Sequence, residues 1–175
     1  MKNLLSAVLF TLLTAGLYAQ EGFKIGFQGG IPIGDFDDQV SLAIAADIGY
    51  VWALGEMVDL GVASGFINGF TDKFDAESEL ADLPNVQFVP AAASLRFWPT
   101  NSVSIGINGG YAVGINDGND GGLYARPLIG YLFSTYTEIN VSYTYVSLEN
   151  FSWSTVTVGF LFTIPSKTRL SRFRS

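Results

Sequence analysis

Residues 22–33 read GFKIGFQGGIPI, and apolar and polar residues alternate along this stretch. One side of the alternation carries Phe23, Ile25, Phe27, Ile31 and Ile33. The other side carries Lys24, Gly26, Gln28, Gly30 and Pro32. A period of two residues predicts a β-strand with one apolar face. When such a pattern repeats through a chain, the apolar face has to meet either a core or a lipid bilayer.

The alternation recurs along the rest of the chain and predicts eight strands. The expected strands are residues 22–33, 39–53, 57–69, 86–98, 102–115, 123–133, 137–148 and 153–164. The fourth and sixth are weaker, because they contain Pro90 and Pro127, which a central strand tolerates poorly. No helical period of useful length follows residue 20. The fold class expected is therefore all-β.

The connections between these strands alternate in length. Those around Gly55, Thr100 and Thr135 are tight, whereas residues 34–38, 71–85 and 116–122 form longer polar links; the last link, 149–152, is short. Short turns at one end and longer loops at the other are typical of an outer-membrane β-barrel. Eleven residues tilted by about 40° rise roughly 28 Å, enough to cross an apolar band of about 25 Å. We expect an eight-stranded antiparallel up-and-down transmembrane β-barrel.

The first nineteen residues have the features of a secretory signal peptide. Lys2 precedes an apolar stretch over residues 4–17, and Ala19 stands at the expected cleavage site. The expected organisation is a signal peptide over residues 1–19, a barrel over 20–165 and a basic periplasmic tail over 166–175. The tail contains Lys167, Arg169, Arg172 and Arg174.

Alternation alone does not distinguish a membrane barrel from a soluble secreted barrel whose apolar face lines a ligand cavity. The polar face favours the membrane barrel, because it consists mainly of Gly, Ala, Ser and Asn, which fit a narrow lumen. Charged residues make up only 14% of the chain, against 49% hydrophobic ones, which is few for a solvated surface. Aromatic residues fall near both ends of the expected apolar faces, as in an interfacial girdle. We therefore expect the bacterial outer membrane as the location.

Six charged residues fall on the expected interior face, three of each sign. They are Lys24, Asp47, Asp59, Arg96, Arg126 and Glu138. This balance favours a self-neutralising network that fills the lumen over a proton or ion path, because an unpaired buried charge is costly. Asp47 and Asp59 lie nearly symmetrically about the turn at Gly55, which suggests that they are neighbours. Arg96 is the expected partner of Asp59.

The expected outer connections are strongly acidic. The longest contains the cluster Asp72, Asp75, Glu77, Glu79 and Asp82, with Lys73 as its single basic residue. Such a run is typical of a solvated surface that meets lipopolysaccharide and its divalent ions, and the alternative is capture of divalent cations or docking of a basic partner. Residues 116–122 resemble a calcium loop in composition but lack its distal Glu, so we expect a hairpin and no metal site there.

Several classes of function are disfavoured by composition. The chain has no His and no Cys, which removes Ser-His catalysis, disulfides and thiolate metal sites. No glycine-rich phosphate loop follows a strand and opens a helix. Sixteen acidic residues against nine basic ones argue against nucleic-acid binding. We expect neither an enzyme nor a bound cofactor.

Several short motifs resemble those of known outer-membrane barrels. They are residues 18–20 (YAQ), 22–26 (GFKIG), 88–91 (FVPA), 96–97 (RF) and 126–131 (RPLIGY). With the overall pattern, they resemble the small eight-stranded OmpA/OmpX-like barrels and, more specifically, the bacterial "outer membrane protein beta-barrel domain" families, which include PorT-like barrels. The resemblance implies an interior charge network at the six positions named above. Family members commonly end on an aromatic residue, whereas here Phe160 and Phe162 are followed by Ile164, Pro165 and the basic tail.

Two functions of different kinds follow. The first is a structural or surface-interaction role through the acidic extracellular loops, with outer-membrane lipid, lipopolysaccharide or an envelope protein as partner. The second is a narrow pore or the barrel component of a secretion or transport assembly. Eight strands leave an interior just filled by side chains, which favours the first.

Overall fold

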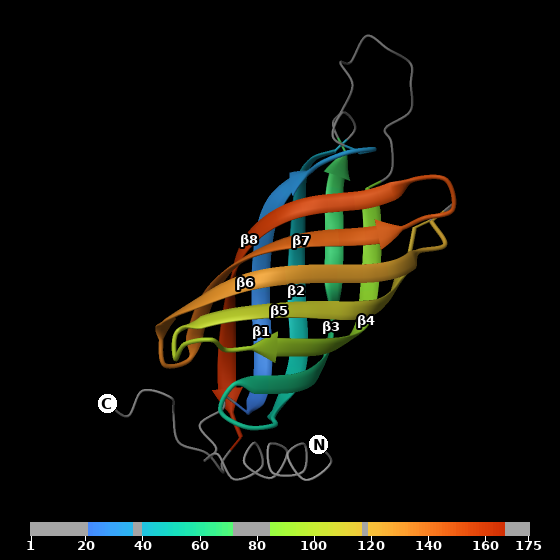
Figure 1. Ribbon diagram of the computed structural model, residues 1–175. Coiled ribbons are helices and arrows are strands. Elements are labelled where there is room, and N and C mark those ends of the chain that lie inside the picture. The colour runs from blue at the N-terminus through green and yellow to red at the C-terminus, as the bar shows by residue number, and fades with distance from the viewer. Residues whose placement is uncertain (1–20, 37–39, 72–84, 117–118, 167–175) are drawn as a thin grey trace, which may run out of the picture.

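The computed structural model describes residues 21–36, 40–71, 85–116 and 119–166. Eight antiparallel strands form one closed barrel in which each strand pairs with its neighbours in sequence and β8 pairs with β1 (Figure 1). The strands are β1 (Gly22–Pro32), β2 (Val40–Ala53), β3 (Val58–Thr71), β4 (Val86–Phe97), β5 (Val103–Gly114), β6 (Gly122–Ser134), β7 (Thr137–Ser147) and β8 (Ser152–Pro165). The predicted fold class and all eight strands are confirmed. Among the described residues, no helix has the length and hydrophobicity needed to cross a membrane.

The register of the ladders sets the tilt and width of the barrel. The pairing can be followed around the barrel from Phe23 on β1, strand by strand, to Ser154 on β8. Ser154 lies opposite Ile33 on β1, whose amide donates to the Ser154 carbonyl at 2.9 Å. The closure is thus staggered by ten residues, from 23 to 33. With ordinary strand spacings, eight strands and this stagger give a tilt of about 40° and a backbone radius of roughly 8 Å. Side chains can fill such an interior.

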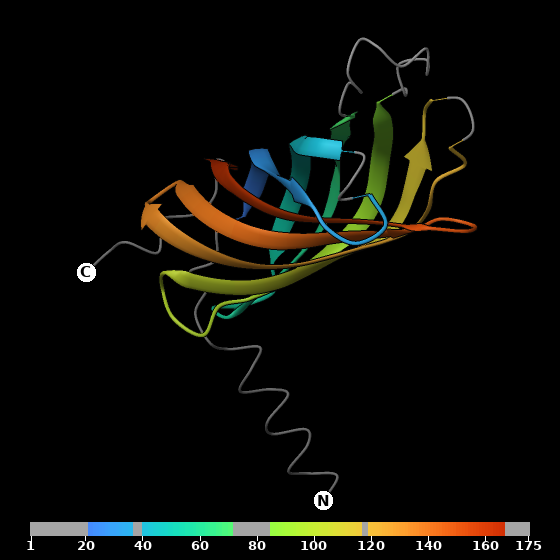
Figure 2. The ribbon, with the colours of Figure 1, turned by 90° about the horizontal axis from the view of Figure 1, so that it is seen from above.

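The tilt is visible in the pictures. In Figure 1, β6–β8 cross in front of β1–β3, and Figure 2, seen from above, shows the two sets on opposite sides, as two walls of one tilted barrel are. The ends of β1 and β8 that carry residues 22 and 165 lie with the turns 54–57, 98–102 and 135–136 at one end of the barrel. The connections after β1, β3, β5 and β7 gather at the other end, here called the outer mouth.

The two faces of the barrel wall differ sharply in chemistry. The outward face is almost wholly apolar, with side chains such as Phe27, Ile129 and Val141 more than half exposed. All six charged residues that lie within the strands face the interior. An apolar outer wall around a polar lumen is the arrangement that a bilayer stabilises.

Pro90 and Pro127, which weaken the predicted fourth and sixth strands, lie at interruptions of a ladder. Pro90 pairs with Ala112 on β5, but on its β3 side the register is interrupted between Ser64 and Ile67. Pro127 pairs with Ile107 on β5, and the ladder from β6 to β7 is interrupted between residues 125 and 128. Because proline has no amide hydrogen, each strand omits pairing on one side there and still spans the barrel.

Candidate functional site: the lumen and the outer mouth

Arg126 and Asp47 form the central ion pair of the lumen. Two guanidinium nitrogens of Arg126 donate to the two carboxylate oxygens of Asp47 at 2.9 and 3.0 Å. Arg126 comes from the middle of β6 and Asp47 from the middle of β2, so the pair spans the interior. The side chains are 2% and 15% exposed, respectively, and this bidentate geometry is the strong form of an ion pair.

Hydroxyl and amide groups complete the hydrogen bonding of this pair. Gln28 donates its amide to Asp47 Oδ2 at 2.6 Å, and its carbonyl accepts from Ser142 at 3.0 Å and Thr157 at 2.8 Å. Arg126 Nε donates to Ser142 Oγ at 3.1 Å. The middle of the lumen is therefore closed by one connected polar network from five strands, β1, β2, β6, β7 and β8.

The other four charges lie nearer the end of the barrel that holds the turns. The guanidinium of Arg96 binds Glu138 Oε1, and Ser104 also donates to that oxygen. Trp98 Nε1 donates to Asp59 Oδ2 at 2.7 Å, and Lys24 Nζ donates to Thr163 Oγ1 at 3.1 Å. The structure thus brings all six predicted charges into the lumen, where they lie at two levels.

The predicted contacts within this set have different outcomes. Asp59 and Arg96 lie opposite each other in the register of β3 and β4, while the ion pair of Arg96 is with Glu138. The suggestion that Asp47 and Asp59 are neighbours is wrong. Asp47 pairs with Gly65, and Asp59 pairs with Ala53, six residues further along the ladder, or about 20 Å at the usual rise per residue. Asp47 lies eight residues before Gly55 and Asp59 only four after it, so the antiparallel ladder does not bring the two carboxylates together.

An apolar plug lies in the lumen below the outer mouth, and the strand alternation alone did not predict it. Its members are Val40, Ala43, Ile67, Phe88, Ala112, Tyr124, Val146 and Trp153. Trp153 and Phe88 are fully buried, with ring centroids 5.7 Å apart. The signal was available, because both aromatic residues fall in the polar phase of their strands, Trp153 with Thr155 and Thr157.

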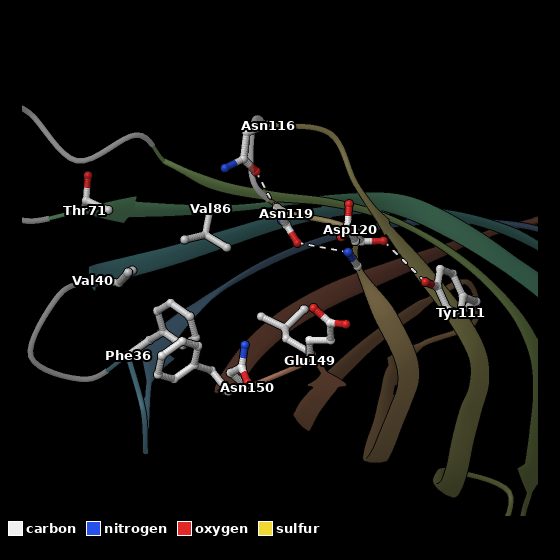
Figure 3. A pocket seen from close by; sticks show the side chains of 13 residues that line it. Phe36, Val40, Thr71, Val86, Tyr111, Asn116, Asn119, Asp120, Glu149 and Asn150 are labelled. Carbon is white, nitrogen blue, oxygen red and sulfur yellow. Dashed lines mark hydrogen bonds between the residues drawn. The ribbon is translucent and has the colours of Figure 1, made fainter.

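Above the plug the outer mouth holds a cavity of about 480 Å³ (Figure 3). Its lining comes from the ends of β1–β2, β3–β4, β5–β6 and β7–β8. The lining residues are Phe36, Val40, Thr71, Val86, Tyr111, Asn116, Asn119, Asp120, Gly121, Leu148, Glu149, Asn150 and Phe151. Figure 3 shows Phe36, Val40 and Val86 on one side of the cavity and Asp120, Glu149 and Tyr111 on the other.

The predicted acidic cluster Asp72, Asp75, Glu77, Glu79 and Asp82 lies outside the described residues, as do the signal peptide and residues 167–175 of the basic tail. Within the described part of the outer connections, Asp35 has a definite role. Its Oδ2 accepts from the amide and the hydroxyl of Ser152 at 2.8 and 3.0 Å. This clamp joins the β1–β2 connection to the start of β8.

The described interior is filled mainly by charged and polar side chains that bind one another. The guanidinium groups of Arg96 and Arg126 each bind a carboxylate, Asp59 accepts a hydrogen bond from the Trp98 indole, and Lys24 donates one to the Thr163 hydroxyl. Over the described ranges, no three acidic, His or Cys side chains gather into a group that could hold a metal ion.

Comparison with known proteins places the fold among small transmembrane barrels. No protein-family model and no curated protein matches the chain. The crystal structure of Ail, the attachment invasion locus protein of Yersinia pestis, matches with a TM-score of 0.57 at 16% identity, over 82% of this chain and 97% of that one. Ail in complex with the heparin analogue sucrose octasulfate matches with a TM-score of 0.50 at 15% identity, over 82% and 97% of the two chains.

A de novo designed transmembrane β-barrel also matches, with a TM-score of 0.53 at 11% identity over 85% of this chain and all of the designed one. At these identities the likeness concerns the fold. Together with the apolar outer wall and the inward charges, it defines the chain as an integral outer-membrane β-barrel, located in the bacterial outer membrane.

Proposed function

We propose that this protein is a closed outer-membrane barrel with a structural or surface-interaction role, carried by the acidic connections at its outer end. The filled lumen is the observation that supports this most strongly. A bidentate ion pair and its network cross the middle, and an apolar plug with fully buried Phe88 and Trp153 lies above them. Moving an ion through the plug would require taking it out of water.

The charge of the outer connections indicates what kind of partner would bind. They hold eleven acidic residues, Asp35, Asp37, Asp38, Asp72, Asp75, Glu77, Glu79, Asp82, Asp117, Asp120 and Glu149. Ail has been seen with a sulfated, polyanionic sugar, whereas these connections repel such a ligand and favour cationic partners or lipopolysaccharide bridged by divalent ions. The protein is not an enzyme in this proposal.

Single-channel recording tests the closed lumen against the narrow-pore alternative. The purified protein, reconstituted in a planar bilayer, should give no steady conductance above that of the bare membrane. A steady conductance that changes in Arg126→Ala or Glu138→Ala, but not in Glu56→Gln on the exposed turn after β2, would overturn the proposal. Antibody labelling of intact cells carrying an epitope between Glu77 and Glu79 tests separately whether these connections face the outside.

A further inference from the structure

The cavity at the outer mouth has a preformed apolar wall. Phe36, Val86 and Leu148 pack against the plug, and Val40 belongs to the plug itself. The ring of Phe36 contacts Trp153 and Phe151 with centroid distances of 5.5 and 6.3 Å. The clamp between Asp35 and Ser152 fixes the backbone on both sides of these rings. A ligand would therefore meet an ordered apolar surface of useful size.

Some polar side chains of the cavity are hydrogen-bonded to the protein itself, and others are available to a ligand. Asn116 Oδ1 accepts from the amide of Gln87 at 3.0 Å, and the Asn119 side chain bonds Gln87, Asn116 and Gly121. These amides hold the β5–β6 connection in place. By contrast, none of the described residues donates a hydrogen bond to the carboxylate of Asp120 or Glu149; the Tyr111 hydroxyl donates to the backbone carbonyl of Asp120, at 3.3 Å.

The described residues of the lining therefore combine an apolar wall with two uncommitted carboxylates, and no basic side chain is among them. We propose that the outer mouth binds a small organic cation, an ammonium or guanidinium group on an aromatic or aliphatic body. The body would lie against Phe36, Leu148 and Phe151, and the cationic head would face Asp120 and Glu149. A neutral analogue would leave both carboxylates unpaired, and an anion would be repelled. Two carboxylates alone are too few ligands for a calcium ion.

The test measures binding of 2-phenylethylammonium to the full chain in neutral-detergent micelles, by residue-resolved NMR shifts. Its matched neutral and anionic analogues are 2-phenylethanol and 3-phenylpropionate. We expect saturable shifts at Gly121, Leu148 and Phe151 with the ammonium, weaker binding of the alcohol, and none of the carboxylate. Micelle partitioning would instead shift residues of the outward face such as Ile129.

Variants locate the head and the body of the ligand. Glu149→Gln should weaken ammonium binding about two- to fivefold, and the double variant Asp120→Asn/Glu149→Gln about tenfold, in the range of partly exposed ion pairs. Both carboxylates are exposed, so the substitutions leave the barrel intact. Raising the salt concentration should also weaken ammonium binding, because salt screens the attraction between the ammonium and the carboxylates. Phe151→Ala should weaken binding of the ammonium and the alcohol alike, and Glu56→Gln, at the far end of the barrel, should change neither.

Equal affinity for ammonium and alcohol, or an unchanged affinity in the double variant, would overturn the inference. So would the absence of saturable shifts at the mouth. The inference rests on the proposed function, whose partner chemistry it specifies. The two fail separately, because binding in micelles reports on the mouth, whereas conductance reports on the lumen and cell labelling on the orientation.

Discussion

At the scale of single residues, the stability of the lumen depends on Arg126. Its guanidinium is 2% exposed and is neutralised by Asp47 from the opposite wall. Removing only the carboxylate would leave a buried cation with neutral partners, Ser142 and Tyr124. Removing one partner of a buried ion pair destabilises a protein more than replacing both by apolar residues, because the remaining charge is buried without compensation.

Asp47→Ala should therefore lower the free energy of unfolding by about 2–4 kcal/mol, slightly less than for a fully buried pair because Asp47 keeps some exposure. The double variant Asp47→Ala/Arg126→Met should recover part of that loss. Urea titration of the protein folded in lipid vesicles, followed by circular dichroism, measures both, with Glu56→Gln as a control within about 0.5 kcal/mol of the parent. A double variant less stable than Asp47→Ala would contradict the idea that the unpaired Arg126 charge causes the loss.

The positions of the interior charges could be predicted from the sequence, but their pairing could not. Lys24, Asp59 and Glu138 each fall in the polar phase of a strand, and that phase alone places them inside. Pairing depends on the ten-residue stagger of the closed barrel, which no single strand records. Arg96 consequently binds Glu138 on β7 rather than being limited to the strand beside it, and Asp47 reaches β6.

At the scale of elements, the phase of a strand predicts the apolar plug as well as the position of the charges. Phe88 lies in phase with Ser94 and Arg96, and Tyr124 lies in phase with Arg126. A large aromatic residue in an otherwise small and polar phase indicates an interior packed by apolar side chains at that level. The strands themselves were predictable because their outward faces are apolar. β4 and β6 form despite Pro90 and Pro127, because one ladder of each strand is interrupted beside the proline.

Gly69 on β3 provides the space that Trp153 on β8 occupies. A Cβ atom added at Gly69 would lie 2.2 Å from Cη2 of the Trp153 ring, which is fully buried. Gly69→Ala should therefore destabilise the barrel by about 1–3 kcal/mol, the usual cost of overpacking a core. Gly109→Ala is the control, because an added Cβ there meets nothing within 4 Å.

The double variant Gly69→Ala/Trp153→Phe separates contact from general damage. Trp153→Phe removes part of the ring and leaves room for the new methyl group, so the two losses should not add. Unfolding midpoints in urea give the coupling energy. Strictly additive losses would mean that the methyl group is accommodated by movement of the β3 backbone instead of by the ring.

At the scale of the whole molecule, the apolar outward face requires an apolar medium around the barrel. The chain leaves apolar side chains exposed all around the barrel and places every charge of the strands inside. In water this surface would promote aggregation, whereas in a bilayer it lies against hydrocarbon. The same alternation would fit a soluble barrel only if the faces were exchanged, and the described structure has the apolar face outward.

This arrangement predicts a strong dependence on depth for charge placed on the outer wall. Val141, at the middle of β7 and 52% exposed, faces outward between Ile129 and Val158, and Val141→Lys should lower the free energy of unfolding in phosphatidylcholine vesicles by about 2–4 kcal/mol. Leu54→Lys, in the turn between β2 and β3, should cost at most about 1 kcal/mol, because the turn lies at the interface. Urea titrations of both variants in the same vesicles give the comparison. In a barrel whose wall met water, Val141→Lys would be neutral or favourable, so equal small effects at both positions would contradict the lipid-facing assignment.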